Sequence, residues 1–245
     1  MTTLGKHIPV AHPAPLRAPA RTVAAALSTF ACFESEMRMI PGVHIDLRSM
    51  YVTERDQGVL ISPVGTSEEE TIVTQRPVTL VAPSLLHHLH LSDAIARYQP
   101  AGLWGPPGLA EKRPDLGGIH VFGRDPWPFA PMLEFALVQG APSRNEVVLF
   151  HRPSRTIYTA DLVFNVHGAR GVLAPIATRL IGIHNRFAVA RMWRYWVKDR
   201  AAFQRSIDRV LGWDFERIVM AHGDIVVEAG AAMLARALRD VGLYP

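Results

Sequence analysis

Histidine and aspartate side chains stand just past the ends of three runs of apolar residues that favour buried strands. These segments are His87-His88, Asp161 and His222. Strand ends are rigid mounting points, and imidazole nitrogens together with a carboxylate suit Zn²⁺ or Fe²⁺. Any one such histidine is commonly a hydrogen-bonded structural residue instead. The repetition of the pattern at three strand ends is what indicates a metal site.

A metal ion held by three histidines and one aspartate could act as a Lewis acid and lower the pKa of a bound water toward neutrality. The resulting hydroxide could attack an ester, lactone, thioester or amide carbonyl. A single metal ion needs help from a nearby hydrogen-bond donor, and the candidates by position are Arg152, Arg155 and Asn165. The structural alternative for these residues is surface ion pairing and a turn around Pro153.

The elements that must position these residues are short strands with helices between them. The predicted strands are 43–53 and 58–64 (a hairpin), 78–82, 103–104, 135–139, 146–150, 156–160 and 217–221. The predicted helical segments are 91–98, 171–211 and 226–241. Strands with helices inserted between them, and helices at the end, predict a layered α/β sandwich.

Composition excludes several classes of protein. The chain has 245 residues, 49% of them hydrophobic and 20% charged, which predicts one ordered domain and argues against disorder. No segment is apolar over the length that a membrane span needs. A net charge of +4 is too small an excess to indicate a nucleic-acid partner. The lone Cys32 excludes an internal disulfide framework and a cysteine-based zinc site.

The ends of the chain differ in character. Residues 1–27 are rich in Pro and Ala and predict a mobile N-terminal arm, so the domain is expected over 28–245. The apolar piece 23–33 lacks a clean signal-cleavage pattern and runs into Glu34 and Glu36, which favours a cytoplasmic protein. The basic, aromatic segment 191–198 predicts an amphipathic lid or a dimer helix, with contact to a membrane surface, nucleic acid or another partner as the alternative. A homodimer is expected through the helical region 171–211.

The order strand–histidine pair–helix, then strand–Asp161, then strand–His222-Gly223 resembles the metallo-β-lactamase fold superfamily. Three longer segments resemble an uncharacterised branch of it, metallo-hydrolase-like and catalogued as a domain of unknown function. They are 80–89, 106–115 and 150–162. The resemblance runs from about Val43 to the C-terminus and implies a four-layer αββα sandwich of one domain. The branch carries no firm activity with it.

Departures from the superfamily's first motif, His-x-His-x-Asp-His, imply that one metal position is lost. When the motif ends on His87-His88, its first two histidine positions fall on Pro83 and Leu85. The third histidine of that site is expected near 139–142, where there is none. The motif can also be aligned so that His88 and His90 take its histidine positions. This alignment ranks second, because it crowds the start of the following helix and loses the Asp-His pair.

The positions of the second metal site remain, and the resemblance implies one divalent ion, with zinc favoured over iron. The implied ligands are His87, His88, Asp161 and His222. The leading hypothesis is therefore a mononuclear metallo-hydrolase that acts on a small molecule, with Asp161, Arg152 and Asn165 as catalytic residues. One alternative is a degenerate member that binds a ligand or partner without turnover. Another is a mononuclear iron oxidoreductase.

Overall fold

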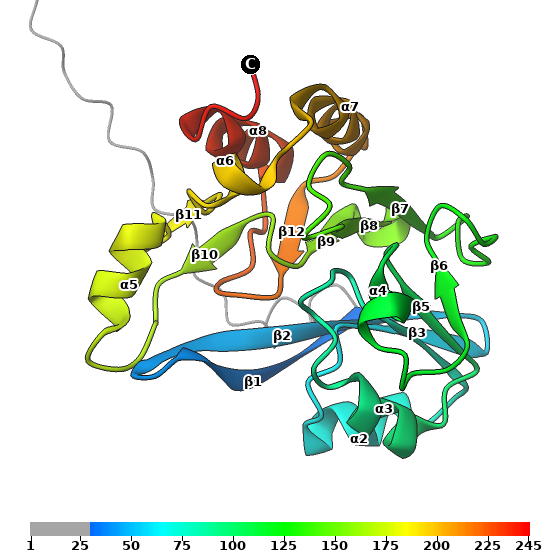
Figure 1. The fold of residues 1–245 in the computed structure, drawn as a ribbon. Coiled ribbons are helices and arrows are strands. Elements are labelled where there is room, and N and C mark those ends of the chain that lie inside the picture. Colours follow the sequence, from blue (N-terminus) through cyan, green and yellow to red (C-terminus); the bar gives the residue numbers. More distant parts are fainter. Residues whose placement is uncertain (1–29) are drawn as a thin grey trace, which may run out of the picture.

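The computed structural model describes residues 30–245, which form three β-sheets (Figure 1). The largest sheet follows chain order: β1 (Phe30–Ile40), β2 (Val43–Glu54), β3 (Gln57–Ile61), β4 (Val78–Val81), β5 (Gly102–Gly105) and β6 (Ile119–Val121). The second sheet has the order β12 (Arg217–Met220), β9 (Thr156–Thr159), β8 (Val147–His151) and β7 (Leu133–Leu137). The third is the pair β10 (Phe164–Val166) and β11 (Arg186–Ala188). The predicted arm 1–27 lies outside the described residues.

Helices cover the outer faces of the two larger sheets (Figure 1). On the six-stranded sheet lie α2 (Ser67–Val73) and α3 (Leu91–Tyr98), and on the four-stranded sheet lie α7 (Arg200–Leu211) and α8 (Gly230–Asp240). The other helices of the described residues are α4 (Leu109–Lys112), α5 (Ala174–Ile181) and α6 (Trp193–Trp196), with a 3₁₀ turn at Arg152–Ser154. The predicted four-layer αββα sandwich is confirmed.

The four-stranded sheet is buried on both faces, which explains why its strands read as continuous apolar runs. Along β9, Tyr158 packs in the core between the sheets, while Ile157 packs in the core beneath α7 and α8. This alternation follows from the two-residue period of a strand. No helix within the described part of the chain combines the length and apolarity needed to cross a membrane.

Most of the predicted elements are present, and the departures have physical causes. The predicted hairpin is the antiparallel pair β2–β3, with Met50 opposite Ile61, and the helix 91–98 is confirmed. The region 171–211 is not continuously helical, because β11 interrupts it to pair with β10. The last helix begins at Gly230 rather than 226, because Val226 bridges Ile218 and keeps that segment extended.

Candidate metal centre

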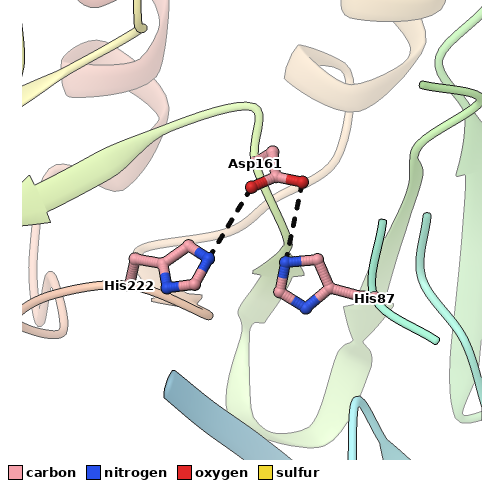
Figure 2. A group of neighbouring side chains, drawn as sticks. All are labelled: His87, Asp161 and His222. Atoms are coloured by element: carbon pink, nitrogen blue, oxygen red, sulfur yellow. Dashed lines mark ion pairs between the residues drawn. The ribbon is translucent and has the colours of Figure 1, made fainter. Parts of the chain in front are cut away.

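His87, Asp161 and His222 come together at one end of the sandwich, with one ligand atom from each lying within 4.8 Å of the others. Figure 2 shows Asp161 between the two imidazole rings. His87 Nε2 lies 3.6 Å from Asp161 Oδ2, and His222 Nε2 lies 3.7 Å from Asp161 Oδ1. The side chains are only 6%, 12% and 3% exposed, so the group is largely shielded from water.

Parallel pairing of β9 and β12 brings Asp161 and His222 to the same edge. Thr159 and Met220 are register partners, and the amide of Ala221 donates to the carbonyl of Thr159 at 3.0 Å. Parallel strands end at the same side of a sheet, so the residues that follow them become neighbours. This is the spatial reason for the pattern seen in the sequence.

The turn after His222 requires glycine. Gly223 has a φ of +93°, and a Cβ added there would lie 2.2 Å from the carbonyl oxygen of Asn165. Asn165 also donates through Nδ2 to the carbonyl of Asp224 at 2.9 Å. Gly223 therefore lets the His222 loop pack against β10 without a side chain in the way.

His87 reaches the site from the six-stranded sheet. The loop after β4 is tied to the other sheet, because Val147 N donates to Pro83 O at 2.7 Å and Leu85 N donates to Arg144 O at 3.0 Å. Ser84 Oγ accepts from the amide of His87 at 3.2 Å and shapes the turn. The two sheets thus hold opposite sides of the candidate site.

Each imidazole is oriented by a hydrogen bond on the side of the ring that faces away from Asp161. His222 Nδ1 donates to the carbonyl of Asp46 at 2.8 Å, which places the proton on Nδ1 and the lone pair on Nε2. His87 Nδ1 lies 2.9 Å from Ser62 Oγ, which can accept a hydrogen bond in the same way. Metal-binding histidines are commonly fixed by such a partner.

Asp161 is held by hydrogen bonds of its backbone, while one of its carboxylate oxygens accepts no hydrogen bond from the described residues. Its amide donates to Glu146 Oε2 at 2.9 Å, and its carbonyl accepts from Trp193 Nε1 at 2.8 Å. Asp161 Oδ2 is buried and has no hydrogen-bond partner among the described residues. A buried carboxylate oxygen left in this state is costly, and a cation between the three side chains would satisfy it. The residues present therefore fit a metal ion.

The charges of the site also suit a cation. Burial opposes ionisation of Asp161, but His87, His222 and Arg144 together hold the pKa of its carboxyl below the usual value. Burial and the proximity of His87 lower the pKa of His222 to about 4. Carboxylate and neutral imidazole are the forms in which these side chains bind metals.

The other predicted site residues do not belong to this group of three. His88 lines the same cavity but is not one of the three grouped residues, and its Nδ1 lies 3.2 Å from the Arg113 guanidinium. Arg152 is exposed and paired with Glu134 at the outer edge of the second sheet. Asn165 is buried behind His222 and does not line the cavity.

The grouped residues open into a cavity of about 460 Å³ with mostly apolar walls. The sequence analysis did not identify two residues near this site, Glu146 behind Asp161 and Arg144 in the cavity wall. Glu146 accepts hydrogen bonds from the backbone amides of Ala160 and Asp161. The feature of the sequence that could have identified it is a charged side chain at the start of a predicted buried strand. Burial and the charge of Asp161 raise the pKa of Glu146 to about 8. Arg144 lines the cavity, and nothing in the turn-like sequence around it indicated a role in a site.

Comparisons with known proteins agree with this architecture. No protein-family profile matches the chain, and no curated protein matches it. Among solved structures, a metallo-β-lactamase from Pontibacter korlensis is similar with a TM-score of 0.53 at 15% identity, over 85% of this chain and 100% of that one. One from Erythrobacter litoralis, with β-mercaptoethanol in its active site, has a TM-score of 0.58 at 14% identity, over 87% and 93%.

The structurally similar proteins also include one that is not named as a β-lactamase. A flavodiiron core from Synechocystis has a TM-score of 0.57 at 12% identity, over 88% of this chain and 59% of that one. At such identities the comparison establishes the fold alone. The chain has the metallo-β-lactamase fold, as its strand-end residues led us to expect.

Proposed function

We propose that this protein is a mononuclear metal-dependent hydrolase that cleaves an ester, lactone, thioester or amide bond in a small molecule. The observation that carries the proposal is the convergence of His87, Asp161 and His222 in the wall of a largely apolar cavity. Both rings turn Nε2 toward Asp161, and Asp161 Oδ2 has no other partner among the described residues.

A divalent ion at this position, zinc more readily than iron, would supply a Lewis acid that lowers the pKa of a bound water. His87 and His222 would hold it through Nε2, and Asp161 through a carboxylate oxygen. His88 is the predicted fourth ligand, and it must leave Arg113 to take part. Arg152 and Asn165 lie outside the cavity, so we assign them no part in bond making.

The apolar walls exclude bulk water around the bond to be cleaved. Met37, Leu47 and Phe164 line the cavity on the side of the sheets, and Met192 and Trp196 line it on the side of α6. Electrostatic interactions are stronger in such surroundings than in water. The electrostatic interaction between the charges of the site and a substrate carbonyl beside Asp161 would therefore be only weakly screened by water.

The test is hydrolysis of p-nitrophenyl butyrate and octanoate by the full chain, metal-free or reconstituted with one equivalent of Zn²⁺. We expect turnover that requires metal and disappears in Asp161→Ala and His222→Ala, while Arg152→Met stays active. Ligand binding without any turnover would contradict the hydrolase and favour the degenerate binding protein. Activity only with Fe²⁺ and consumption of O₂ would favour the iron oxidoreductase.

We also retain a homodimer through residues 171–211 and a cytoplasmic location as parts of this proposal. Exposed apolar side chains support the dimer: Val172 is 92% exposed, Leu180 70% and Ile176 60%. Such a patch is typical of a contact surface. Ile176→Glu should convert a dimer to a monomer in light scattering, and an unchanged mass would contradict this interface.

A further inference from the structure

A second charged group, Arg144, faces the cavity and is not one of the three grouped candidate ligands. The guanidinium of Arg144 lies over the ring of Trp196, with Cζ 3.4 Å from the ring centroid, and both residues line the cavity. Stacking of this kind holds a planar cation in one orientation. Arg144 is therefore a fixed group rather than a mobile surface side chain.

Arg144 has a hydrogen-bonding capacity that its surroundings do not use. Its Nε is buried and has no hydrogen-bond partner among the described residues. A guanidinium presents its donors in a rigid fork that matches the two oxygens of a carboxylate. Because the side chain lines the cavity, its fork fits a ligand that brings acceptor oxygens.

The other cationic group in the cavity is already engaged, and the rest of the wall is apolar. Lys112 Nζ donates to the carbonyl of Leu85 at 2.5 Å. Apolar side chains continue to the mouth, where Leu86, Leu89 and Met192 line the cavity and remain 39%, 67% and 42% exposed. A ligand that fits has one anionic or acceptor end and an apolar chain that leads toward the mouth.

We propose that Arg144, stacked on Trp196, binds the carbonyl oxygen of an acyl substrate with an apolar chain, and the carboxylate that this oxygen becomes in the product. The inference rests on the proposed hydrolysis for the reaction. There, the oxygen of water bonds to the acyl carbon, the bond from that carbon to the leaving group breaks, and the leaving group takes up a proton. The guanidinium of Arg144 stabilises the negative charge that develops on the carbonyl oxygen by donating hydrogen bonds to it.

The test is isothermal titration calorimetry on the metal-free full chain with octanoate, 1-octanol and acetate. Octanoate should bind more tightly than 1-octanol, which lacks the charge, and than acetate, which lacks the chain. Arg144→Met should weaken octanoate binding by about 10- to 100-fold, as expected for a charge-assisted hydrogen bond. The same substitution should leave 1-octanol binding unchanged, which also shows that the variant is folded.

Two further variants complete the design. Arg144→Lys keeps the charge but not the fork, so its octanoate affinity should lie between those of the wild type and Arg144→Met. Arg152→Met removes a guanidinium outside the cavity and should bind like the wild type. Octanoate binding that is absent, no tighter than that of 1-octanol, or insensitive to Arg144→Met would overturn the inference.

Because the protein is metal-free in these titrations, failure of the metal site does not affect them. Binding of octanoate that depends on Arg144 in a protein that takes up no metal would keep this inference and refute the hydrolase. Metal uptake without octanoate binding would refute this inference and leave the proposed hydrolase standing.

Discussion

Two histidines near Asp161 are adjacent in the chain but differ in the state of their rings. His87 directs Nε2 at the carboxylate and contacts Ser62 through Nδ1. His88 has its Nδ1 within 3.2 Å of Arg113, an obligate donor, so its remaining proton lies on Nε2. Burial, Lys112 and Arg113 also lower the pKa of His88. The hydrogen-bond network thus favours His87 as the ligand of this pair.

This difference predicts unequal effects of two alanine substitutions on Zn²⁺ affinity. His87→Ala should weaken affinity by more than about 100-fold, because even loss of an outer hydrogen-bond partner costs about 10- to 100-fold. His88→Ala should leave it within a few-fold of the wild type, as measured by competition with a chromogenic chelator. Equal losses in the two variants would make His88 the fourth ligand.

A histidine outside the site predicts part of the pH dependence of stability. His151 is 1% exposed, its Nδ1 lies 2.7 Å from Ser154 Oγ, and burial lowers its pKa to about 4. In the unfolded chain the value is about 6.5, so the unfolded state binds the proton more readily between these values. The stability contributed by neutral His151 is complete above about pH 6.5 and is lost as the pH falls toward 4.

The loss amounts to on the order of 3 kcal/mol over that interval. Urea unfolding of the wild type and of His151→Gln at several pH values between 4.5 and 7 measures it. The free energy of unfolding should fall less steeply with acidification in the variant. Glu146, with its pKa raised to about 8, and His222, with its pKa lowered to about 4, also make stability depend on pH. Both are present in the two proteins, so the difference in slope isolates His151. Parallel pH profiles would contradict the assignment.

At the scale of elements, Glu146 connects the start of β8 to the end of β9. Its two carboxylate oxygens accept the amides of Ala160 and Asp161 at 2.9 Å each, in the segment that carries the Asp161 side chain. Glu146→Ala should lower Zn²⁺ affinity by about 10- to 100-fold. It should also lower the free energy of unfolding by about 1–3 kcal/mol, because two buried amides lose their acceptor.

Glu134→Ala is the matched control, since it removes a glutamate on β7 that pairs with the exposed Arg152. Chelator competition and urea unfolding of both variants separate the two glutamates. Unchanged metal affinity in Glu146→Ala would show that Asp161 does not depend on this link.

The elements that carry the site could be predicted from the sequence, because β4, β9 and β12 are short apolar runs with a chemical signature just after each. β1 was missed, because its identity depends on pairing with β2 along nearly its whole length rather than on local pattern. Arg144 was missed for a similar reason. Arg144 stacks on Trp196, which is far away in the chain, so the spacing of neighbouring residues in the sequence does not indicate this contact.

At the scale of the whole molecule, the proposed ion links the two large sheets. His87 follows β4 in the six-stranded sheet, whereas Asp161 and His222 follow β9 and β12 in the four-stranded sheet. A ligand that binds only the folded state stabilises it by about 2.7 kcal/mol at one hundred times its Kd. Zn²⁺ should therefore raise the Tm of the wild type in differential scanning calorimetry.

Asp161→Ala should gain no stability from Zn²⁺, because the variant lacks the carboxylate that would hold the ion between His87 and His222. A variant that gains as much as the wild type would place the ion elsewhere.

Metal content tests the central claim most directly. Elemental analysis by inductively coupled plasma mass spectrometry should find about one zinc or iron ion per chain in protein purified without added metal. Asp161→Ala and His222→Ala, purified in the same way and shown by circular dichroism to be folded, should contain almost none. Full metal content in either variant, or no metal in the wild type even after reconstitution, would contradict the site formed by His87, Asp161 and His222.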